Sequence, residues 1–224
     1  MALLIPTAGG WISLARVFPG LPPGWKPWAP LAAGAALYAL VHWAFRRPLG
    51  LYVFGHELTH AAAALLSGYK VKSLFISGKG GEVELSDTNV AVALAPYCVP
   101  IYTLGVVLLY LFVDYYAAFS SPPPWVGAAV GFTYAFHAAL TVHALRERQP
   151  DLKHAGVIFS LSAILFSNTL VLAGILKLLF PAEVSFPGWA LGALADTRFL
   201  IERAGDFLEA AGRWAVERIR ELRG

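Results

Sequence analysis

Residues 89–113 read NVAVALAPYCVPIYTLGVVLLYLFV and contain no Asp, Glu, Lys or Arg. A helix of this length is long enough to cross the hydrocarbon core of a bilayer, which is about 30 Å thick. Two further stretches, residues 122–145 and 155–180, hold almost no charge either. A water-soluble domain of this size could not bury so much apolar surface, so the sequence predicts insertion into a membrane.

The overall composition agrees with a membrane protein. Of the 224 residues, 58% are hydrophobic and 14% are charged, whereas soluble domains average about 45–50% and about 25%. The net charge of +3 is modest, and the Lys and Arg residues form no stripe with aromatic residues. We therefore expect no nucleic acid partner. Cys98 is the single cysteine, which excludes an intramolecular disulfide.

The apolar stretches predict an all-α polytopic membrane protein with about five membrane helices. The second helix is expected to end at Gly68, because glycine commonly terminates helices. Pro96 and Pro100 are expected to bend the third. The five expected helices run over residues 31–45, 51–67, 89–113, 125–145 and 155–180.

The two ends of the chain differ from this membrane-embedded domain, which we expect over residues 31–180. Residues 1–30 contain several prolines and tryptophans, so they are expected to form an irregular, interfacial segment. Residues 181–224 are expected to form a linker and, from about Leu191, an amphipathic helix. That helix is expected to lie on the membrane, on a partner, or on the bundle of this chain.

A β-hairpin is expected between the second and third membrane helices. Polar and apolar residues alternate over residues 69–76 and again over 82–85, with a glycine-rich turn at 78–81 between them. Such a hairpin either connects two helices or offers a strand edge that can hold an extended peptide.

Inside the second expected helix stands the sequence His56-Glu57-Leu58-Thr59-His60. Residues i and i+4 share a helix face, so His56 and His60 can both bind one metal ion. Glu57 is then placed to take a proton from a metal-bound water. Polar groups in a membrane helix are costly unless they are paired or bind a metal. The alternative is a polar cluster that joins helices by hydrogen bonds or lines an ion path.

A catalytic zinc usually has three protein ligands and one open position. Downstream candidates for the third ligand are His137, His143, Asp151 and His154. Asp151 follows Pro150 at the start of the fifth expected helix, where a carboxylate can point back into the bundle. From the residues alone, Asp151 could equally be an N-cap of that helix.

The run from Gly55 to Ala61, the following Leu65-Leu66-Ser67-Gly68, the hairpin and the later membrane helices together resemble the site-2 proteases. These are intramembrane zinc metalloproteases. The resemblance covers about residues 50–180 and implies a minimal or divergent member without a PDZ domain. We expect this multi-pass protein in a prokaryotic cell membrane.

The resemblance also implies roles for two residues. Asp151 would be the third zinc ligand, although Pro150-Asp151-Leu152 stands where the family usually has Leu-Asp-Gly. The family has an Asn about eight residues before this Asp, and this chain has His143 there. His143 would then be a catalytic hydrogen-bond donor to the substrate carbonyl; the alternative is an interfacial histidine.

A polar stripe on the fourth expected helix contains Thr133, His137 and Thr141 at four-residue steps. We interpret His137 as a hydrogen-bonded packing residue, with a role beside a metal ligand as the alternative.

The resulting expectation is a zinc-dependent endopeptidase that acts in the lipid bilayer on a membrane-protein substrate. It would use His56, His60 and Asp151 as ligands and Glu57 as general base and acid. The alternative is a non-proteolytic membrane protein with a structural metal site or a polar transport pathway.

Overall fold

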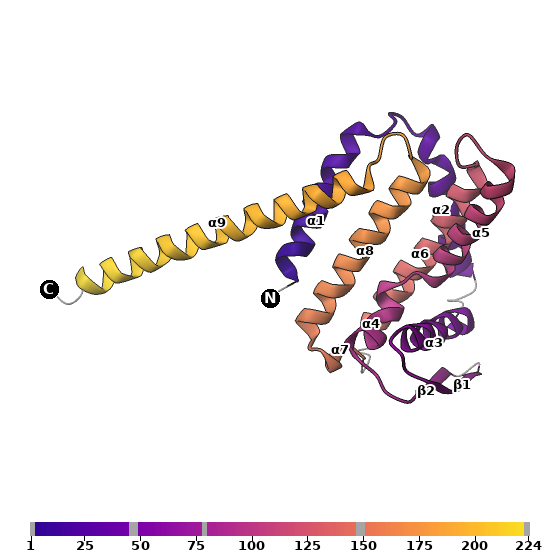
Figure 1. The fold of residues 1–224 in the computed structure, drawn as a ribbon, viewed down its shortest axis with the longest axis horizontal. Coiled ribbons are helices and arrows are strands. Elements are labelled where there is room, and N and C mark those ends of the chain that lie inside the picture. The colour runs from indigo at the N-terminus through magenta and orange to yellow at the C-terminus, as the bar shows by residue number, and fades with distance from the viewer. Residues whose placement is uncertain (1–2, 45–48, 78–79, 147–150, 222–224) are drawn as a thin grey trace.

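The computed structural model describes residues 3–44, 49–77, 80–146 and 151–221. These residues are mostly helical, with one small antiparallel sheet (Figure 1). The α-helices are α1 Leu4–Val17, α2 Ala29–Ala44, α3 Leu49–Leu66, α4 Val90–Cys98, α5 Ile101–Ala117, α6 Pro124–Arg146, α7 Asp151–His154, α8 Val157–Leu179 and α9 Phe186–Glu221. Two short 3-10 helices cover Phe18–Gly20 and Lys26–Trp28, and the strands are β1 Val71–Ser77 and β2 Gly80–Leu85.

Candidate membrane spans are present among the described residues, but fewer helices are long and apolar enough to cross a membrane than the five that the sequence predicts. The helices α6 and α8 are long and apolar enough to cross a membrane. The pair α4 and α5 qualifies as a third crossing if the two helices count as one bent span. The helix α2 has 16 residues, about 24 Å at 1.5 Å per residue, which is short of a full crossing.

The third expected span is broken where the sequence places prolines. The axes of α4 and α5 differ by 70°, and the break falls at Val99 and Pro100. A residue before proline is driven out of the helical region, and Val99 has φ −115° and ψ 107°. Pro96 lies inside α4. The expected bend is therefore confirmed, and it turns α4 towards α3.

The helices α2 and α6 pack at close range (Figure 1). A side chain on Gly34 would collide with the carbonyl oxygen of Ala128, and one on Gly131 would collide with that of Leu31. Small residues allow such close approach of helix backbones in membrane bundles. Around this contact, Tyr38 of α2 is buried with Phe136 and Leu140.

The β-hairpin is confirmed. The strands β1 and β2 pair antiparallel, with Leu74 opposite Val83 and Phe75 opposite Glu82; part of the expected turn, residues 78–79, lies outside the described residues. The preceding helix α3 ends at Leu66, and Gly68 has a φ of +81°. This left-handed conformation is easily adopted by glycine, so the expected end of the helix at Gly68 is also confirmed.

The expectation of an irregular N-terminal segment is wrong for residues 4–17, which form α1. Pro6 is compatible with this helix because it lies in the first turn, where the missing N–H has no partner to lose. The chain then turns through Pro19, Pro22 and Pro23. An interfacial position of residues 1–30 remains a prediction.

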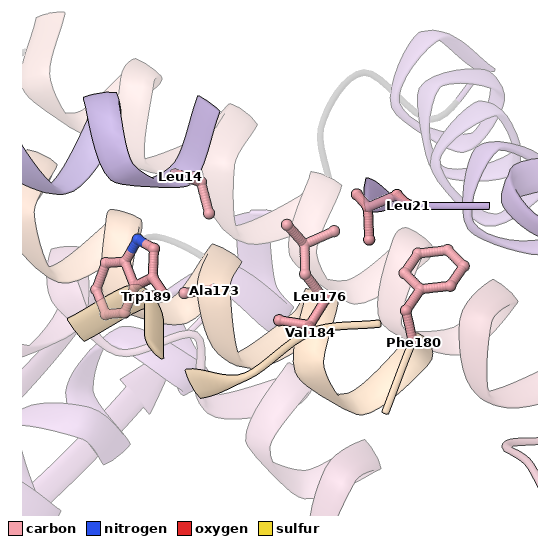
Figure 2. Close-up of a cluster of buried hydrophobic side chains, with 7 residues drawn as sticks. All are labelled: Leu14, Leu21, Ala173, Leu176, Phe180, Val184 and Trp189. Carbon is pink, nitrogen blue, oxygen red and sulfur yellow. The ribbon is translucent and has the colours of Figure 1, made fainter. Parts of the chain in front are cut away.

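The N-terminal helix packs with α8 and the start of α9 around one cluster of buried side chains (Figure 2). Ser13 Oγ donates a 2.9 Å hydrogen bond to the carbonyl of Trp189, and Arg16 pairs with Asp196 at 2.8 Å. The cluster is formed by Leu14, Leu21, Ala173, Leu176, Phe180, Val184 and Trp189. The first turns of α9 are therefore held on the bundle.

The expected C-terminal helix is confirmed, and it starts earlier than Leu191, at Phe186. Beyond its contact with α1, α9 extends away from the other helices (Figure 1). Its apolar residues Phe199, Phe207, Leu208 and Trp214 are exposed. Its charged residues pair with one another, as between Arg198 and Glu202, so the amphipathic pattern is present on the helix.

Candidate metal centre

His56 and His60 lie on one face of α3, and Asp151 begins α7. The two histidine Nε2 atoms are 3.2 Å apart. Asp151 Oδ2 lies 3.8 Å from each of them. The chain therefore brings together two imidazole nitrogens and one carboxylate oxygen, all within 4.8 Å of one another.

This group of donors fits a tetrahedral zinc ion. Two ligands at about 2.0–2.1 Å from a tetrahedral centre are roughly 3.3 Å apart, close to the 3.2 Å between the histidine nitrogens. Two nitrogens and a carboxylate with one position left for water are a typical catalytic zinc set. The histidine side chains are 11% exposed and the Asp151 side chain is 27% exposed, so a bound ion would be largely shielded by protein.

The His60 ring is held in the orientation that a metal ligand needs. Its Nδ1 lies 2.9 Å from the carbonyl oxygen of Val92 on α4. A carbonyl can only accept, so Nδ1 carries the proton and Nε2 keeps its lone pair for a metal. The bend after α4 positions this carbonyl, because it turns α4 against α3.

The third donor, Asp151, is held from two sides. The hydroxyl of Tyr97, a residue 1% exposed on α4, donates a 2.8 Å hydrogen bond to Asp151 Oδ2. The carbonyl of the next residue, Leu152, accepts a 3.0 Å hydrogen bond from Ser160 Oγ on α8. Asp151 is thus the first residue of α7 and also faces the two histidines, as a ligand would.

The charge of Asp151 suits the role of a ligand. Burial by itself raises the pKa of the Asp151 carboxyl, but the neighbouring His56 and the hydroxyl of Tyr97 outweigh this effect. The pKa of Asp151 is therefore below its ordinary value, and the group stays ionised at neutral pH.

Glu57 lines the same pocket as the three donors. The pocket has a volume of about 740 Å³. Its walls come from α3, α4, α7, β2 and the segment after β2, through His56, Glu57, His60, Gly81, Glu82, Val83, Leu85, Asp87, Thr88, Ala93 and Asp151. The carboxylate of Glu57 accepts the backbone N–H of Val83 on β2. Glu57 is therefore next to the donor group and fixed by the hairpin.

Close packing of the hairpin on α3 creates this arrangement. A Cβ at Gly81 would lie 2.6 Å from Val53 Cγ1 and 2.7 Å from Glu57 Cγ. Both distances are too short for a real side chain, so any larger residue here would displace Val53 and Glu57 or move β2 away from α3. The hairpin thereby forms one wall of the pocket.

No other histidine side chain in the described part of the chain joins this donor group. His143 is on α6 and belongs neither to the three-residue donor group nor to the residues that line this pocket. His137 lines a separate, smaller cavity that His56 also lines. The side chain of His154 lies outside the described residues. His42 Nδ1 lies 2.8 Å from the hydroxyl of Tyr38 on its own helix.

No protein-family model, curated protein or solved structure matches this chain. A function for this chain is therefore inferred from the geometry of the site alone. Two residues that the sequence did not indicate belong to that arrangement, namely Tyr97 beside Asp151 and Val83 beside Glu57. A tyrosine in an apolar helix and a backbone amide in a strand carry no signal of such contacts.

Proposed function

We propose that this protein is a multi-pass membrane zinc endopeptidase that hydrolyses a peptide bond in or near a transmembrane segment of another membrane protein. The observation that carries the proposal is the convergence of His56, His60 and Asp151. The first two share a helix face, but Asp151 comes from a helix far along the chain. The carboxylate residue Glu57 lines the same pocket as these three donors.

In this proposal the residues divide the chemistry as follows. Zinc, when bound by the three donors, lowers the pKa of a coordinated water towards 7. Glu57 accepts a proton from that water and delivers it to the amide nitrogen of the leaving peptide. Its hydrogen bond from the Val83 amide keeps the carboxylate in place for both transfers. His143 has no part in this scheme, because it does not line the pocket.

The membrane part of the proposal uses five membrane segments, one of which is the bent pair α4–α5. The spans α6 and α8 and the bent pair α4–α5 meet the criteria of length and hydropathy. The helices α2 and α3 are proposed to lie in the same bilayer, since α2 packs on α6 and α3 packs on α4. The donor-bearing helix α3 would then place zinc below the membrane surface, where transmembrane substrates are found.

The hairpin is proposed to hold the substrate. A protease needs its substrate extended, because a helical backbone hides the scissile carbonyl in hydrogen bonds. In the described sheet β2 pairs with β1 on one side, and residues of β2 line the pocket. A peptide paired with β2 would extend past Glu57.

A structural metal site is the alternative, and the pocket argues against it. Structural zinc is almost always closed by four protein ligands. Here three donors face a pocket of about 740 Å³, which leaves room for both water and a peptide.

The deciding experiment compares wild type with Glu57→Gln and with Asp87→Asn, a matched substitution of a carboxylate that lines the same pocket but lies outside β2. The purified proteins, in detergent and in liposomes, are analysed for zinc and tested on labelled casein and a panel of single-span membrane peptides. We expect stoichiometric zinc in all three proteins and cleavage by wild type and Asp87→Asn only. Equal cleavage by Glu57→Gln would reject the proposed function, as would absence of zinc from wild type.

A further inference from the structure

A second cavity adjoins the candidate metal centre. It has a volume of about 20 Å³ and is lined by residues of α3, of the bend between α4 and α5, and of α6. His56 lines both this cavity and the large pocket. Among the other lining residues are Tyr52, Pro96, Tyr102, Phe136 and His137. The small cavity and the large pocket are therefore both in contact with the same proposed metal ligand.

Three of the residues around this cavity carry buried polar atoms without a hydrogen-bond partner in the described part of the chain. The atoms are His56 Nδ1, Tyr52 Oη and His137 Nε2. Buried polar groups are nearly always paired, with protein or with ordered water. A single polar partner in the shared cavity would satisfy these three atoms.

The expected protonation of the two histidines makes them complementary. His56 directs Nε2 towards His60 and Asp151, so as a metal ligand its proton must be on Nδ1, which is then a donor without an acceptor. The ring of His137 makes a hydrogen bond with the backbone carbonyl of Tyr97. Since Nε2 has no partner, the nitrogen that donates its proton to this carbonyl is Nδ1. Nε2 of His137 is then an acceptor without a donor.

The cavity has the size of one water molecule. A site needs at least about 10–15 Å³ and two to four polar partners to hold a water, and this cavity offers about 20 Å³ and three such residues. A single water can accept a hydrogen bond from one group and donate a hydrogen bond to another. It can therefore pair with the donor of His56 and the acceptor of His137 at the same time.

We propose that a buried water in this cavity accepts the Nδ1 proton of His56 and donates to Nε2 of His137, with the Tyr52 hydroxyl as its third partner. His137 and Tyr52 are thus positioning residues that fix the ring of His56, as the Val92 carbonyl fixes that of His60. The two histidine ligands would be oriented by different means, one by a backbone carbonyl and the other through a water. This inference rests on the proposed metal site.

The test measures zinc affinity by chelator competition, together with the visible spectrum of the cobalt-substituted protein. The variants are His137→Leu, which removes the acceptor, and Tyr52→Phe, which removes the hydroxyl but keeps the ring that packs on His56. Matched controls are His42→Leu and Tyr38→Phe, a histidine and a tyrosine that bond to each other on α2. His137→Gln keeps an acceptor at a similar reach and serves as the rescue variant.

We expect roughly a 10–100-fold loss of zinc affinity for His137→Leu and Tyr52→Phe, the range typical of lost partners of metal ligands. The controls should stay within about twofold of wild type, and His137→Gln should recover part of the loss. Affinity within about twofold of wild type in both test variants would overturn the inference while leaving the proposed function intact. The same holds if the variants lower only the thermal stability of the metal-free protein, which is the behaviour of packing residues.

Two further outcomes are also decisive. If His137→Leu fails to fold, Tyr52→Phe decides alone, because it alters a single hydroxyl. If wild type binds no zinc, the proposed function fails first and this inference fails with it, a result that differs from zinc-loaded variants with unchanged affinity.

Discussion

The hydroxyl of Tyr97 donates a 2.8 Å hydrogen bond to Oδ2 of Asp151. The same ring meets His56 edge to face, with centroids 5.4 Å apart. Tyr97 therefore contacts two of the three proposed ligands from α4, the helix whose Val92 carbonyl orients the third. This short helix, created by the break at Val99 and Pro100, supports the whole donor group.

The substitution Tyr97→Phe is expected to weaken zinc binding about tenfold, because the carboxylate of Asp151 loses its hydrogen-bonded support while the buried ring is retained. Zinc affinity of the purified protein is the measurement. Tyr38→Phe is the control, since Tyr38 is also buried and also makes a 2.8 Å hydrogen bond, but to His42 on α2. Equal affinities for Tyr97→Phe and the control would show that this contact does not support the ligand.

Asp151→Ala is expected to remove stoichiometric zinc, since two histidines alone leave the ion with too few ligands. The matched variant is Asp87→Ala, which deletes another carboxylate from the same pocket but outside the donor group. Metal analysis of the two purified variants beside wild type gives the answer. Full zinc content in Asp151→Ala would remove Asp151 from the set of ligands.

Much of the layout follows from local sequence, because its causes are local. The apolar stretches predicted α6 and α8, proline predicted the break after α4, and strand alternation around glycines predicted the hairpin. The i, i+4 spacing of His56 and His60 likewise fixes their shared face on α3.

The parts that were missed depend on contacts between distant segments. The prolines of residues 1–30 predict irregular chain, but only Pro6 lies within α1, and it falls in the first turn, where proline is tolerated. The convergence of Asp151 with α3 followed only from a family resemblance, since the position of Asp151 in the sequence left an N-cap equally possible. The cavity shared by His56 and His137 arises from the packing of three helical elements, which no local pattern encodes.

Gly81→Ala is expected to abolish most of the proposed cleavage activity while zinc stays bound. The added methyl group would meet the side chains of Val53 and Glu57 at 2.6–2.7 Å, so either the Glu57 side chain shifts or β2 moves away from α3. Glu57 then loses its hydrogen bond from Val83, whereas the metal donors come from other residues. Cleavage and zinc content are measured together. Gly105→Ala, where the new methyl group meets nothing within 4 Å, is the control, and a Gly81→Ala protein as active as this control would contradict the proposed role of the hairpin wall.

Gly131→Ala is expected to destabilise the folded protein by about 1–3 kcal/mol, the usual cost of overpacking. Its new methyl group would collide with the carbonyl oxygen of Leu31, a backbone atom that cannot move unless α2 separates from α6. Gly174→Ala tests the same substitution within α8, where nothing lies within 4 Å of the new methyl group. That variant should be as stable as wild type or more so, since alanine favours helices over glycine. Thermal unfolding in detergent compares the two proteins, and equal midpoints would show that α2 and α6 do not need their close contact.

Because α6 carries His137 and borders the small cavity, a loosened α2–α6 contact should also weaken zinc binding in Gly131→Ala but not in Gly174→Ala.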